Sequence, residues 1–251
     1  MFTPLRRHLL ASLSGVLALG VLPPARAATR PLRAVALQVA PFGMLDAQGR
    51  PGGIFVDVFR LLEKEAGLQV EISVAPYARA MAMLRSGEAD LLLATSSVPI
   101  AQLAEPMGML WQVDVMAIGR AGLALDSERD LRGLRVGIVR GADYGVPFLD
   151  GDNFTRHDTR DQLQAIRLLV EKRIDASVGT RLAIQYAIHV QGLRREQLGS
   201  MVRIQTREVH LHLSKRRADP ELESRLRRAV EALRSSGRID ALVTSYAGGL
   251  G

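Results

Sequence analysis

The chain has 251 residues, of which 47% are hydrophobic and 24% are charged. This composition is typical of a globular protein and excludes an intrinsically disordered one, and the length is sufficient for one large domain or two lobes. The formal net charge is +7, but the basic residues are spread along the chain without the interleaved aromatics of a nucleic-acid groove. We therefore expect no nucleic-acid partner.

The first 27 residues have the pattern of a secretory signal. Arg6 and Arg7 precede an apolar run over 9–22, which is shorter than the ~20 residues that a membrane-spanning helix needs. A proline pair breaks the run, and Ala25, Arg26 and Ala27 follow as a small-x-small cleavage site. We predict a cleavable signal over 1–27, and its arginine pair leaves both the general and the twin-arginine export routes open. Cleavage would lower the net charge from +7 to +4, because three arginines and no acid would leave.

The chain contains no cysteine. An exported protein without cysteine has no disulfides and cannot carry a lipid on a mature N-terminal cysteine. We therefore expect a soluble periplasmic protein without a lipid anchor, held together by its core alone.

After the signal, the first part of the chain alternates strand and helix patterns. The stretch 55–67 places apolar residues at helical spacing and ends at Gly67, and the run "ADLLLA" (89–94) is typical of a strand buried on both faces. We predict strands at 33–39, 68–74 and 89–94, and helices at 55–67 and 77–87. This order favours a mostly parallel sheet with right-handed crossovers.

A second unit repeats the pattern. It has predicted strands at 134–139, 174–179, 201–206 and 208–214, and predicted helices at 160–173 and 181–192. An amphipathic helix at 220–237 and a last helix at 238–249 close the chain. The prediction is an α/β fold of two lobes, with lobe I at 28–118 and 208–251 and lobe II at 119–207. Ligands of open α/β sheets bind beyond the carboxyl ends of the strands, so the hydroxyls of Thr95, Ser96 and Ser97 should face a cleft.

The stretch "GIFVDVFRLLEKEAGLQVEISVAPYARAMAMLRSGEADLLLA" (53–94) resembles the polar amino-acid type of solute-binding protein from bacterial ABC importers, called family 3. Further matches are "LRGLRVGIVRG" (131–141), "EKRIDASV" (171–178) and "DPELESRLRRAVEALRSSGRIDAL" (219–242). The resemblance implies a type II periplasmic-binding-protein-like fold, in which each lobe is a mostly parallel sheet flanked by helices. It also implies that a two-strand hinge joins the lobes and that they close on a small solute.

The chain departs from the family pattern at the positions that hold an amino acid. The family usually grips the α-carboxylate with an arginine after its serine/threonine segment, and that position is Ala101 here. An aspartate that takes the α-ammonium is replaced by Thr180, and Phe55 replaces an acid of the characteristic stretch. Both halves of the amino-acid clamp are therefore absent, and other residues must hold the solute.

Several residues are candidates for that role. Arg79 and Arg140 could bind an anionic group, the latter at a strand-to-helix turn. Asp143 could replace the ammonium partner or cap a helix, and aromatic side chains could stack on the solute. The predicted ligand-binding set is Phe42, Tyr77, Arg79, Thr95, Ser96, Ser97, Arg140, Ala142, Asp143, Tyr144, Thr180 and His210.

We expect no metal and no cofactor. Glu208, His210 and His212 alternate along one predicted strand and so share a face. A His-x-His pair on a strand is only a weak sign of a metal site, and the spacing of the sequence offers no further ligand to complete one. A polar lining near the hinge is the alternative that we prefer.

We expect a periplasmic receptor that captures a small polar solute, amino-acid-like or an organic acid, for an ABC permease of the inner membrane. The receptor would be a monomer and not an enzyme. Two alternatives stay open. One is a dehydratase-like enzyme acting on a cyclic carboxylic acid in the same cleft, for which Glu208, His210 and Asp143 are the candidate acids. The other is a partner or sensor protein with a degenerate cleft.

Overall fold

The computed structural model describes residues 30–249, so the predicted signal over 1–27 lies outside the described residues. Residues from Pro31 onward form one compact unit. Its strands β1 (Leu32–Leu37), β4 (Val70–Ala75) and β5 (Leu91–Thr95) are mutually parallel. Helix α1 (Ile54–Ala66) and helix α2 (Tyr77–Ser86) connect them, as the sequence predicts. We call this part the first half.

Helix α1 shows why these boundaries could be predicted. It buries Ile54, Val58, Phe59 and Leu62, which share one face at helical spacing. Gly67 follows in the left-handed conformation, with φ of 59°, and its N–H returns to the carbonyls of Glu63 and Lys64. Glycine adopts this conformation without strain, so the helix ends where the sequence places it.

The second half contains strands β7 (Arg135–Val139), β8 (Thr155–Thr159) and β9 (Ala176–Thr180), and β7 runs parallel to both neighbours. Helices α4 (Gln162–Val170) and α5 (Arg181–Val190) pack together beside them. The edge strand β8 was not predicted, because four of its five residues are exposed and leave no apolar pattern.

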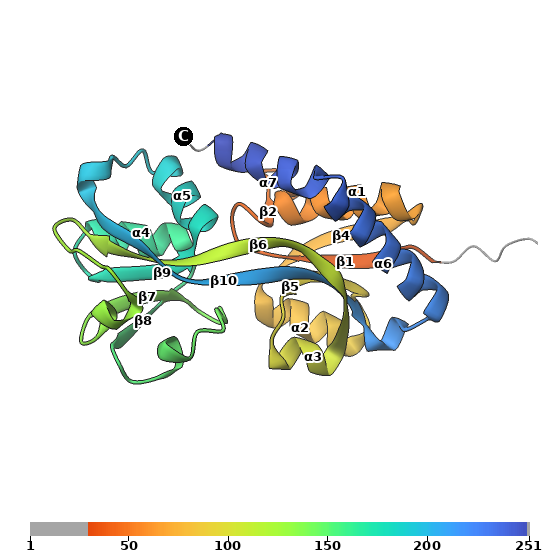
Figure 1. The fold of residues 1–251 in the computed structure, drawn as a ribbon, viewed down its shortest axis with the longest axis horizontal. Helices are drawn as coiled ribbons and strands as arrows, with labels where there is room; N and C mark the ends of the chain where they lie inside the picture. Colours follow the sequence, from red (N-terminus) through yellow and green to blue (C-terminus); the bar gives the residue numbers. More distant parts are fainter. Residues whose placement is uncertain (1–29, 250–251) are drawn as a thin grey trace, which may run out of the picture. The chain divides into compact units, whose positions relative to one another are not determined.

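Two strands of 17 residues, β6 (Ala104–Arg120) and β10 (Leu198–Ser214), run side by side through both halves (Figure 1). The sequence predicted two strands at 201–206 and 208–214, which is wrong: they are one strand with register irregularities. Strand β10 pairs with β5 through Val209–Leu213, and β6 pairs with β9 from Val115 onward.

The pairing produces one eight-stranded mixed sheet in the order β4-β1-β5-β10-β6-β9-β7-β8. The α/β fold is confirmed, but the two sheets that we expected are hydrogen-bonded into a single ladder by the strands that join them. Around residues 112–114 of β6 and 206–208 of β10 the ladder consists of these two strands alone, because pairing with β5 and β9 stops on either side.

Four separate apolar clusters form the core, two at each end of the sheet. In the first half, α1 packs with α6 (Pro220–Ser235) and α7 (Arg238–Gly248) on one face, and α2 packs with α3 (Val98–Leu103) on the other (Figure 1). The remaining elements are the short strand pair β2 (Met44–Leu45) and β3 (Pro51–Gly52) and the 3-10 turns η1 (Glu128–Leu131), η2 (Pro147–Asp150), η3 (Arg195–Gln197) and η4 (Lys215–Arg217). Within residues 30–249, no helix combines the length and apolar character needed to cross a membrane.

Candidate functional site

A cavity of about 240 Å³ lies where the two halves meet. Its wall includes Gln38, Thr95, Arg140 and Thr180, which stand at or just past the carboxyl ends of β1, β5, β7 and β9. This is where ligands of parallel α/β sheets bind. Its volume is slightly below the ~300–1,000 Å³ of sites for drug-sized molecules, so a small metabolite fits it better.

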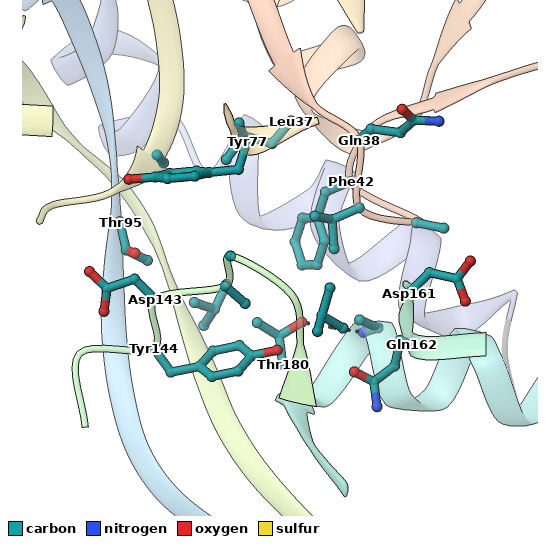
Figure 2. Close-up of a pocket in the computed structure, with 18 of the residues that line it drawn as sticks. Leu37, Gln38, Phe42, Tyr77, Thr95, Asp143, Tyr144, Asp161, Gln162 and Thr180 are labelled. Carbon is teal, nitrogen blue, oxygen red and sulfur yellow. Dashed lines mark hydrogen bonds between the residues drawn. The ribbon is translucent and has the colours of Figure 1, made fainter. Parts of the chain in front are cut away.

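Nine of the twelve predicted residues line the cavity: Phe42, Tyr77, Thr95, Ser97, Arg140, Ala142, Asp143, Tyr144 and Thr180. In Figure 2, Tyr77 and Phe42 come from the first half, and Tyr144 and Thr180 lie opposite them in the second half. The three aromatic rings leave a space between them that a flat or branched organic group can enter.

Three predicted residues do not line the cavity. Arg79 is exposed and forms an ion pair with Glu88 at 2.8 Å, and His210 contacts Glu208 at 3.2 Å. Ser96 is exposed, although its backbone carbonyl accepts a hydrogen bond from a cavity residue, Arg207.

The floor of the cavity comes from the two long strands. Val113 and Val115 of β6 and Arg207 and Val209 of β10 line it. Residues 207 and 209 share a face because side chains alternate along a strand, which turns Glu208 and His210 away. Two of the three acids considered for a dehydratase therefore lie off the cavity wall.

Arg207 connects the two halves across the cavity. Its Nη1 donates to the carbonyl oxygen of Tyr144 at 2.9 Å, and its Nη2 donates to the carbonyl oxygen of Ser96 at 2.6 Å. Ser96 follows β5 in the first half, and Tyr144 follows β7 in the second. The local sequence pattern does not predict this residue at the site, because nothing in it shows which way Arg207 points.

The start of α4 forms another part of the wall that was not predicted. Asp161 caps the helix by accepting from the N–H of Gln164 at 2.7 Å, and it also accepts from Nε of Arg160 at 2.9 Å. Gln162 is buried and donates to Ser177 Oγ at 2.9 Å. The cap signal, an aspartate before an apolar helix, was present in the sequence.

An aromatic row runs from the cavity into the core of the first half. The ring of Phe42 lies 5.3 Å from that of Phe55, which lies 6.0 Å from the ring of Trp111. Both phenylalanines line the cavity, and Trp111 is buried behind them. Phe55, which replaces an acid of the family pattern, thus places a hydrophobic ring at the cavity wall.

Tyr144 is the other aromatic residue with an unusual environment. Its hydroxyl donates to the carbonyl of Val178 at 3.4 Å, and burial raises the pKa of the phenol above its ordinary value. The hydroxyl therefore stays neutral and acts only as a hydrogen-bonding group at physiological pH. Among the described residues, no group of three or more His, Cys, Asp or Glu side chains is placed to hold a metal ion.

Residues 33–105 match the family model for bacterial extracellular solute-binding proteins, family 3. A probable histidine-binding protein from Neisseria gonorrhoeae is 24% identical over 220 residues, which is 83% of this chain and 80% of that protein. A histidine kinase sensor domain with similarity to periplasmic binding proteins superposes with a TM-score of 0.72 and 21% identity, covering 87% of this chain and 96% of that one.

A substrate-binding protein of an amino-acid ABC transporter from Streptococcus pneumoniae, solved with L-arginine, superposes with a TM-score of 0.71 at 18% identity. The match covers 88% of this chain and 95% of that one. These structural likenesses show the fold, which is the type II fold that the sequence predicts. The family model and the named binding proteins agree with the expectation of a binding protein. The three comparisons together confirm that this chain resembles the family 3 solute-binding proteins of amino-acid importers.

Proposed function

We propose that this protein is a periplasmic receptor that captures a small organic solute between its two halves and presents it to an ABC permease. The observation that carries this proposal is the cavity, whose wall draws residues from both halves and from the two strands that join them. A ligand that contacts both halves stabilises the arrangement in which they lie close together. The named relatives are a probable histidine-binding protein and a transporter substrate-binding protein solved with L-arginine, and both amino acids are small solutes of this kind.

The proposal includes the lobe boundaries and the export route expected from the sequence. Lobe I would comprise 28–118 and 208–251, and lobe II would comprise 119–207. Residues 1–27 would be removed on export, and the mature protein would be a monomer. The narrow two-stranded part of the sheet around 112–114 and 206–208 supports a hinge at this place, since only two strands must bend there.

The single tryptophan offers a direct test of ligand binding. Because Trp111 packs against Phe55, which in turn packs against Phe42, a ligand that touches these phenylalanine rings should change the tryptophan fluorescence. We expect saturable fluorescence change and thermal stabilisation with at least one member of a panel of amino acids, organic acids, polyamines and short peptides. Turnover should be absent.

Closure is tested separately by small-angle X-ray scattering on the same samples. The radius of gyration should decrease when the solute that stabilises the protein is added. If no panel member changes fluorescence or melting temperature, the receptor proposal fails. Conversion of a cyclohexadienyl acid to an aromatic product would replace it by the dehydratase alternative.

A further inference from the structure

The cavity has unbalanced positive charge. Three arginines line it, Arg140, Arg160 and Arg207. Of these three, Arg160 is neutralised by Asp161 at 2.9 Å. Arg207 bonds two carbonyl oxygens and no carboxylate, and the side chain of Arg140 makes no hydrogen bond or ion pair within residues 30–249. Two guanidinium groups are therefore available to an anion.

The carboxylates at the cavity are not placed to receive a cation. Asp143 accepts from the N–H of Gly145 at 2.8 Å, and Asp161 is held by Gln164 N–H and by Arg160. Figure 2 shows both carboxylates directed away from the space between Phe42 and Tyr144. An ammonium group there would lose its hydration without gaining a counter-charge, which is costly.

The remaining wall is apolar or neutral. Phe42, Phe55 and Val209 are buried cavity residues that favour a hydrophobic body in the ligand. Ser97 Oγ is shielded from solvent and has no hydrogen-bond partner among the described residues, although Ser97 lines the same cavity. Thr95 also lines the cavity, and its hydroxyl can donate to an oxygen of the ligand.

We propose, on the basis of the receptor function above, that the solute is a small organic carboxylate with an apolar body and no ammonium group. Arg140 and Arg207 bind the carboxylate, Thr95 donates a hydrogen bond to it, and Phe42 and Phe55 contact the body. Guanidinium groups suit carboxylates because their donors match both oxygens. The class differs from the amino acids named for the relatives, since the ammonium partner is missing.

The test compares ligands that share one body and differ in the charged group. The probes are 3-phenylpropionate, phenethylamine, 3-phenylpropionamide and L-phenylalanine, with 4-methylvalerate and L-leucine as an aliphatic pair. Isothermal titration calorimetry gives the dissociation constants. We expect each carboxylate to bind at least tenfold more tightly than the amine, amide or amino acid with the same body.

Arginine variants assign the binding groups. Arg140→Ala and Arg207→Ala should each weaken carboxylate binding at least tenfold, and Arg140→Lys should recover part of the loss because it restores the charge. Arg79→Ala is the matched control, because Arg79 lies off the cavity and pairs with Glu88. It should leave the affinity within a factor of two, and thermal unfolding checks that each variant folds.

The outcomes separate this inference from the receptor function. Tighter binding of L-phenylalanine or L-leucine than of the matching carboxylate overturns the carboxylate class and leaves the receptor intact. Unchanged affinity in both arginine variants overturns the assignment of the binding groups. Absence of binding by these probes and by the broad panel overturns both proposals.

Discussion

A single methyl group at Gly145 should break the contact that Arg207 makes across the cavity. Gly145 has a left-handed φ of 59°, and a Cβ at this position would overlap the guanidinium of Arg207. In Gly145→Ala, Arg207 must therefore move and give up its hydrogen bonds to the carbonyls of Tyr144 and Ser96. The expected result is a loss of stability together with a loss of ligand affinity.

The magnitude follows from two contributions to the free energy of unfolding. A left-handed backbone costs a non-glycine residue ~1–2 kcal/mol. A hydrogen bond from a charged donor contributes ~1.5–3 kcal/mol, but Arg207 is half-exposed and water can replace its partners, so we take ~1–2 kcal/mol for both bonds together. Gly145→Ala should cost ~2–4 kcal/mol in total.

Urea unfolding measures this cost against a matched control. Gly122 has a φ of 79° and open space where a methyl group would stand, with no heavy atom within 4 Å, so Gly122→Ala should cost only the ~1–2 kcal/mol of backbone strain. In an Arg207→Ala background, Gly145→Ala should cost no more than this control, because the clash is gone. Additive effects of Gly145→Ala and Arg207→Ala would refute the reasoning.

Three further predictions use other parts of the molecule. Burial lowers the pKa of His212 from 6.5 to about 4, so stability is full above pH 6.5 and is lost as the pH falls toward 4. Urea unfolding of His212→Gln should show that its free energy of unfolding falls over this pH range by up to ~3 kcal/mol less than that of the wild type. An equal fall in both proteins would contradict the assignment. Hydrogen bonds from Arg135 and Arg120 hold the pKa of Asp175 well below its usual range. Asp175→Asn should therefore cost ~1–2 kcal/mol at pH 7, in a difference that shrinks below about pH 4 as the wild-type carboxylate is protonated. Thr180→Asp keeps the cap of α5 but adds a carboxylate to the cavity wall, so calorimetry should show 3-phenylpropionate binding at least tenfold weaker and L-phenylalanine binding no weaker.

The local parts of the fold could be predicted because their signals are local. Apolar spacing and a terminal glycine define α1 and α2, and an uninterrupted apolar run defines β5. The two long strands were harder to predict from the sequence. The sequence predicts no element over 104–120, where β6 lies, and it divides β10, because each strand is covered by different neighbours in the two halves and its apolar pattern changes midway.

The positions of site residues followed from topology, but side-chain directions did not. Thr95, Arg140 and Thr180 lie at the carboxyl ends of strands. Ligands of parallel α/β sheets bind there, so topology alone predicts these residues at the cavity. Arg79 was expected there because it is close in sequence to Tyr77. Two residues along a helix turn the side chain by about 200°, so when Tyr77 faces the cavity Arg79 faces solvent. Arg207 depends in the same way on the register of β10, which no local pattern reveals.

The continuity of the sheet bears directly on how the two halves could close. An undivided eight-stranded sheet would resist bending, since ladders along its whole width would have to deform together. Here the ladder narrows to β6 and β10 at residues 112–114 and 206–208, and two-stranded ribbons twist more than wide sheets.

Asp114 lies within this narrow part and accepts from Thr206 Oγ1 at 2.9 Å and from Arg181 at 3.0 Å. The bond from Arg181 ties the ribbon to α5 of the second half, so in the proposed closure we expect bending on the side of Asp114 that leads to the first half. Arg207 lies on that side, with a hydrogen bond to each half. A change in the angle between the halves therefore changes the position of Arg207 in the cavity, which links the bending of two strands to the binding of an anion.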